Sequence, residues 1–132
     1  NDQPYFNHVG AHTTEAIDPG LLVITGSLND GVTFEAAEQA LQAVLQPLQD
    51  QIVAHKELEK AQNQLEAHST YMAVDLLHRV QELAMGTILG DTHLVNQEVA
   101  HIQQVTPSAL HSAAQSVLRV DNCATIHYQR ED

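Results

Sequence analysis

The residues of this chain that could most readily do chemistry are its nine histidines. A zinc-binding peptidase helix carries H-E-x-x-H or H-x-x-E-H, because two imidazoles one helical turn apart hold the metal and the carboxylate beside them activates water. The nearest approach is His12–Ala16, which reads His-Thr-Thr-Glu-Ala and has alanine in place of the second histidine. Glu98 and His101 are helix neighbours, but no third ligand accompanies them. The pattern is typical of scattered surface histidines, so we predict no metal site in this chain.

A catalytic nucleophile is not recognisable either. No serine lies in a G-x-S-x-G elbow, and Cys123 has no sequence neighbours that would activate a thiol. The stretch Gly26–Gly31 lacks both G-x-G-x-x-G and G-K-[ST], so it matches no phosphate-binding loop. We therefore predict no catalytic residue in this chain.

Charge excludes two classes of partner. Seventeen acidic residues oppose five basic ones, which gives a net charge of -12. A nucleic-acid binder needs clustered Lys and Arg to displace counterions, and anionic membrane surfaces attract the same residues. No apolar run approaches the length of a membrane span. The single cysteine, Cys123, rules out an internal disulfide, and its apolar surroundings predict a buried, inert thiol.

The N-terminal part predicts a β-hairpin followed by a helix. Strands are expected over Tyr5–Ile17, with Gly10 as a candidate bulge, and over Leu21–Leu28. The turn Asp18-Pro19-Gly20 joins them, since Pro presets one dihedral and Gly accepts positive φ. Thr33 is placed to cap a helix from Phe34, which Pro47 should end or kink.

The remaining chain predicts three further helices and a strand. One long helix, with a possible break near His68–Tyr71, is expected over Lys56–Leu89. It should end at Gly90, and Asp91 or Thr92 then caps a short helix. Thr106-Pro107 predicts the start of the next helix, and the alternation of Cys123–Tyr128 predicts a strand. The fold class is therefore α+β, with two layers in which a small antiparallel sheet, the hairpin plus the C-terminal strand, packs under four helices.

Three strands form a small sheet for so many helices. Because sheets normally pair their internal edges, we expect more strands upstream of Asn1 in a longer protein. The chain starts without Met, so it is either processed or a piece of a longer protein, and 1-132 is expected to be one partial domain. No signal peptide opens it, and bacterial cytoplasm and periplasm both remain open as compartments.

Several stretches resemble a known family. They are Asp18–Ile24, Leu28–Val32, Glu35–Glu38, Glu57–Leu65, Leu89–Asp91 and Val105–Pro107, in that order along the chain. Together they resemble the C-terminal, non-catalytic domain of insulinase/pitrilysin-type zinc metallopeptidases, in the bacterial branch similar to processing peptidases. The likeness runs from about Tyr5 to Tyr128.

The resemblance implies a non-catalytic substrate-chamber domain of a zinc-dependent endopeptidase. It implies that zinc, held by H-x-x-E-H and a later Glu, belongs to a catalytic domain in the same chain or in a partner subunit, within a homo- or hetero-oligomer around a peptide substrate. Tyr5 matches the family's substrate-contacting Tyr, while the Arg that accompanies it would fall upstream of Asn1. A packing role for Tyr5 stays open. Two other interpretations also stay open: a structural, assembly or peptide-binding domain of the same fold that has lost catalysis, and an autonomous acidic binding module.

Overall fold

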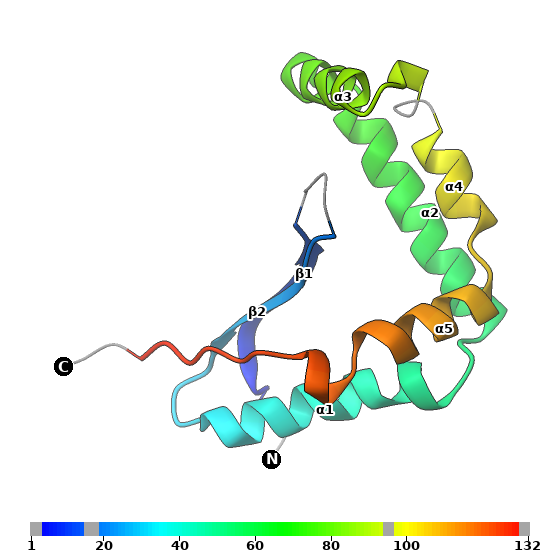
Figure 1. Cartoon of the computed structure of the whole chain (residues 1–132). Helices are drawn as coiled ribbons and strands as arrows, with labels where there is room; N and C mark the ends of the chain where they lie inside the picture. The colour runs from blue at the N-terminus through cyan, green and yellow to red at the C-terminus, as the bar shows by residue number, and fades with distance from the viewer. Residues whose placement is uncertain (1–3, 15–18, 94–96, 130–132) are drawn as a thin grey trace. The chain divides into compact units, whose positions relative to one another are not determined.

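The computed structural model describes residues 4–14, 19–93 and 97–129. It is an α+β structure with the order β1, β2, α1, α2, α3, α4, α5 and a short 3-10 turn, η2 (Figure 1). Two compact units form, and the boundary after His111 falls within α5. Unit 1 is Asn1–Gln51 with Ser112–Asp132, and unit 2 is Ile52–His111. Among the helices described, none is both long enough and apolar enough to cross a membrane.

The predicted hairpin is confirmed. Strand β1 (Phe6–Thr13) lies beside β2 (Leu22–Leu28) (Figure 1). The two strands pair antiparallel, in a register that sets Thr13 opposite Leu22. The irregularity in the ladder lies between Phe6 and His8, so the bulge predicted at Gly10 is wrong, and Gly10 pairs with Thr25. The hairpin belongs to unit 1.

Close packing in the hairpin, and not a positive φ, explains the glycine at position 20. The Thr14 amide donates to the Leu21 carbonyl at 2.9 Å, and the Leu21 amide donates to Thr14 Oγ1 at 2.8 Å. A Cβ on Gly20 would lie 2.6 Å from Thr14 Oγ1 and 2.7 Å from Thr14 O. The positive-φ glycines of the described chain are Gly31 and Gly90, and Asp18 of the predicted turn lies outside the described residues.

Helix α1 (Phe34–Asp50) begins where the sequence predicts. Thr33 is its N-cap, since Thr33 Oγ1 accepts from the Ala36 amide at 3.3 Å. Pro47 does not end the helix, which continues to Asp50. A proline in the last turn removes one amide donor but leaves few later bonds to disturb, and this explains the difference.

Helix α5 (Pro107–Val117) also begins at its predicted cap. Thr106 Oγ1 accepts from the Ala109 amide at 3.2 Å. Within unit 1, Gln115 Nε2 donates to the Gln49 carbonyl at 3.2 Å, and Gln49 Nε2 donates to the Leu118 carbonyl at 2.9 Å. Two side-chain amides thus join the last turn of α1 to the C-terminal end of α5.

Unit 2 is built on two helices that pack against each other (Figure 1). These are α2 (His55–Met72) and α4 (Glu98–Gln104). Leu58 and Gln62, one turn apart on α2, are buried to 6% and 7% exposure. Gln62 Nε2 donates to the carbonyls of Ile102, Gln103 and Val105 at 2.9, 3.4 and 3.1 Å, so one side chain caps the C-terminal end of α4.

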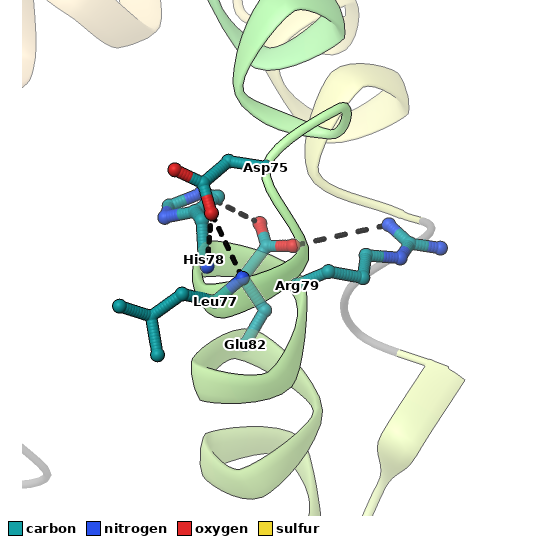
Figure 2. A network of polar contacts seen from close by, with 5 residues as sticks. All are labelled: Asp75, Leu77, His78, Arg79 and Glu82. Carbon is teal, nitrogen blue, oxygen red and sulfur yellow. Dashed lines mark hydrogen bonds and ion pairs between the residues drawn. The ribbon is translucent and has the colours of Figure 1, made fainter.

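The expected long helix is broken, as predicted, but later than predicted. It stops at Met72 and resumes as α3 (Leu76–Ile88), so the break falls after His68–Tyr71. Asp75 is the cause, because its Oδ1 accepts from the Leu77 and His78 amides at 2.8 and 3.2 Å (Figure 2). One turn further on, Glu82 pairs with His78 at 3.4 Å and with Arg79 at 3.8 Å.

Removing this cap gives a measurable test of the break. Asp75→Ala is expected to lower the free energy of unfolding by about 1 kcal/mol, because two amides of the first turn of α3 lose their acceptor. Urea denaturation followed by circular dichroism measures the change. Asp75→Asn is the matched control and should retain most of the stability, since its side-chain oxygen also caps. Equal loss in both variants would contradict the capping role.

The predicted C-terminal strand is wrong for the residues described. Residues 123–129 form no strand, and the sheet formed by the described chain has two strands, β1 and β2. A strand needs a partner for its backbone groups, and none of the described segments provides one at Cys123–Tyr128. Cys123 is exposed, which corrects the prediction of a buried thiol. Four helices were expected and the described residues form five, because Asp75 divides the long one.

Each unit buries little. The buried apolar side chains of the described residues are Ala37 and Ala114 in unit 1 and Leu58 in unit 2, and no large side chain among them is completely buried. Every buried polar side-chain atom there has a hydrogen-bond partner. Hydrogen bonds from capping side chains at the helix ends are therefore important for the local structure of each unit.

Candidate functional site

Two histidines, His8 and His12, lie on β1. On β1, His8 lies opposite Ser27 and His12 opposite Val23. No group of three or more His, Cys, Asp or Glu side chains that could hold a metal occurs in the parts of the chain that the structure describes. Glu15 and the side chain of Glu98 lie outside the described residues. The side chains that the structure describes therefore do not assemble a zinc site.

Tyr5 stands just before β1 in unit 1. Its side chain is 49% exposed. Its backbone carbonyl accepts from the Asn29 amide at 3.1 Å, and Asn29 Nδ2 donates to the Pro4 carbonyl at 2.6 Å. Asn29 thus fixes the backbone around Tyr5 and leaves half of its side chain accessible.

A hollow of about 410 Å³ lies on the polar face of α1. Four side chains line it, Glu35, Glu38, Gln39 and Gln42. Two carboxylates and two amides offer acceptors and donors for hydrogen bonds, and none is a nucleophile. The side chains around the hollow are all polar, and the sequence prediction did not find it.

The carboxylate at the rim of this hollow is held in its charged form. The pKa of Glu35 is lowered, chiefly by its hydrogen bond to its own backbone amide, then by the Thr33 hydroxyl and by the charge of His127. Glu35 also lies in the first turn of α1, where the helix dipole favours negative charge. The hollow is therefore anionic at neutral pH.

His127 bonds one of these lining residues, Glu38, again within unit 1. Its Nε2 lies 2.7 Å from Glu38 Oε1, and its ring stacks on Phe34 with centroids 4.3 Å apart and planes 3° apart. The alternation of the C-terminal segment gave a signal for this placement, because it sets His127 on the face opposite Ile126 and Tyr128. Sequence reasoning treated that segment only as a strand.

A second charge pair lies elsewhere in unit 1. Arg119 Nε donates to Asp121 Oδ1 at 2.8 Å. The hydrogen bond from Arg119 lowers the pKa of Asp121 and raises that of Arg119. The pair is exposed, and we assign it no part in the site.

Comparison with solved structures identifies the fold. The chain matches the inactive peptidase domain of a protein from Bordetella parapertussis described as a zinc protease, with a TM-score of 0.76 and 23% identity, over 96% of this chain and 71% of that one. It matches a protein of Bordetella pertussis Tohama I, also described as a zinc protease, with a TM-score of 0.71 and 24% identity, over 86% of this chain and 63% of that one.

Sequence comparison adds no assignment, because no protein-family model matches the chain and no curated protein matches it. The α+β class and the predicted resemblance are confirmed by these structures at the level of the fold. The chain spans less than two thirds of the length of the second structure. The chain thus has the fold of a zinc protease's inactive peptidase domain.

Proposed function

We propose that this chain is a non-catalytic domain of an insulinase-type zinc endopeptidase and forms part of the chamber that receives the peptide substrate. One observation carries the proposal: nearly the whole chain, 96% of it, shares the fold of a domain described as an inactive peptidase domain. A structural or assembly role for the same fold is the competing outcome of the test below.

In this proposal zinc belongs to a different domain. The described residues bring no three metal-ligating side chains together, so nothing in them fits the ion. When bound in its own domain, zinc lowers the pKa of a water molecule and polarises the scissile carbonyl. This chain contributes binding and orientation of the peptide, which limits the freedom that substrate must lose in the reaction.

Two features of unit 1 could contact a peptide. Tyr5 offers a half-exposed ring on a backbone that Asn29 holds in place. The hollow on α1 offers the carboxylates of Glu35 and Glu38, which would attract cationic or amide-rich segments. We propose Tyr5 as the substrate contact and the hollow as a secondary polar surface.

A cleavage assay tests whether catalysis belongs to a domain other than this chain. The purified chain with added zinc is expected not to cleave an unstructured fluorogenic peptide, and cleavage should appear when the polypeptide bearing H-x-x-E-H is supplied from the same gene or its neighbour. Zinc-dependent cleavage by the chain alone that disappears on His12→Gln would contradict the proposal.

The chamber role needs a separate readout. In the assembled enzyme, Tyr5→Ala should raise KM several-fold, whereas Tyr71→Ala, an exposed tyrosine of unit 2, is the matched control and should leave KM unchanged. If Tyr5→Ala leaves KM unchanged and the complex fails to form without this chain, the assembly role replaces the chamber role.

A further inference from the structure

The last described residues form an extended segment that lies on α1. We call residues 123–129 the C-terminal strap. Ile126 and Tyr128 are 91% and 90% exposed, while His127 between them points to the first turns of α1. The strap is therefore attached through one side chain of its alternating pattern.

The attachment combines a ring stack with a polar bond. The imidazole of His127 lies parallel to the Phe34 ring at 4.3 Å, and its Nε2 is 2.7 Å from Glu38 Oε1. No other hydrogen bond joins the strap to a helix or strand within the part of the chain that the structure describes. Release of this one side chain would free the strap from α1.

Helix α1 places two carboxylates near the imidazole. Glu38 bonds it directly, and Glu35 in the first helical turn also acts on it through charge. Helix α1 contains no lysine or arginine, so no cation on that helix offsets the two carboxylates. The partial positive charge of the helix N-terminus opposes them only in part.

We propose that His127 attaches the C-terminal strap to α1 and that the strength of this attachment depends on pH. A protonated imidazole donates a charge-assisted hydrogen bond to Glu38, and a neutral one makes only an ordinary bond there. The attachment is therefore stronger with a protonated imidazole than with a neutral one, and a rise in pH that removes the proton weakens it.

Attachment of the strap to α1 also changes the hollow on that helix. Glu38 both lines the hollow and bonds His127, so the carboxylate is engaged while the strap is attached. Release frees the carboxylate of Glu38 in the hollow and uncovers the ring of Phe34. The attachment of His127 thus couples pH to the charge that this face of α1 exposes, whether or not a peptide binds there.

The single cysteine gives a direct probe. Cys123 lies in the strap, is exposed, and is the one thiol of the sequence, so a nitroxide label reports the motion of the strap without any cysteine replacement. Spin-label spectra of the full chain between pH 5.5 and 8.5 should show the ratio of immobile to mobile label falling about two- to fivefold, the range of an exposed ion pair. Added salt should reduce the ratio at pH 5.5.

Variants decide whether His127 is responsible. Glu38→Gln keeps the side-chain shape and should abolish most of the pH response, as should His127→Gln. His12→Gln on β1 is the control, because it removes a different exposed histidine of unit 1 and should leave the response unchanged. A response that is absent in the unmodified sequence, or that persists in Glu38→Gln, overturns the proposal. Both replacements lie at exposed positions, and circular dichroism confirms that the variants are folded.

Discussion

Leu58→Ala is expected to lower the free energy of unfolding by about 2–5 kcal/mol. Leu58 is 6% exposed on α2 and is the large apolar side chain that unit 2 buries best among its described residues. Its removal loses the transfer free energy of the side chain and leaves a cavity that the helices cannot fully close. Urea denaturation of the full chain, followed by circular dichroism at 222 nm, measures the change as a shift of the helical transition.

The matched control lies on the same helix. Leu65 is 50% exposed, so Leu65→Ala makes the same chemical change with little burial lost, and it should change the free energy by less than about 0.5 kcal/mol. Equal destabilisation in the two variants would show that Leu58 packs no more closely than Leu65.

Gln62→Ala is expected to cost about 1–3 kcal/mol, because it leaves the carbonyls at the end of α4 without their shared donor. Those carbonyls, of Ile102, Gln103 and Val105, belong to the last turn of a short helix that has few other bonds. The same denaturation experiment measures the loss. Gln64→Ala, two residues away and exposed, should be close to neutral.

A second replacement distinguishes the hydrogen bonds from simple packing. Gln62→Glu keeps the shape but puts a carboxylate against three carbonyl oxygens. It should be at least as destabilising as Gln62→Ala at pH 7 and should recover in part at pH 4, where the acid can donate again. Full stability of Gln62→Glu at pH 7 would contradict the capping role.

Local chemistry explains why some elements could be predicted. Thr33 and Thr106 each precede a helix and have a hydroxyl within reach of its amides, so their cap positions depend on neighbouring residues alone. Gly90 ends α3 with positive φ for the same local reason. The hairpin follows from period-two alternation on both sides of a Pro-Gly turn.

Other features depend on context that the pattern does not contain. The break before α3 was expected at residues of poor helix propensity, yet the decisive signal was Asp75, a good N-cap directly before two leucines. The C-terminal alternation is real, but a strand also requires a partner, and 123–129 find none among the described residues. The stack of His127 on Phe34 joins residues far apart in the sequence, and no local rule predicts it.

The amide bonds between Gln49, Gln115 and Leu118 have a consequence for the order of folding. They join residues 66 and 69 positions apart, and the segment between them is essentially unit 2. In an unfolded chain this is a long loop to close, and each doubling of loop length costs about 0.6 kcal/mol of entropy. Once unit 2 is ordered, fewer flexible residues separate Gln49 from Gln115, so the loop behaves as a shorter one. Order in unit 2 should therefore lower the entropy cost of joining α1 to α5. Replacements that destabilise unit 2, Leu58→Ala or Gln62→Ala, should also slow that joining.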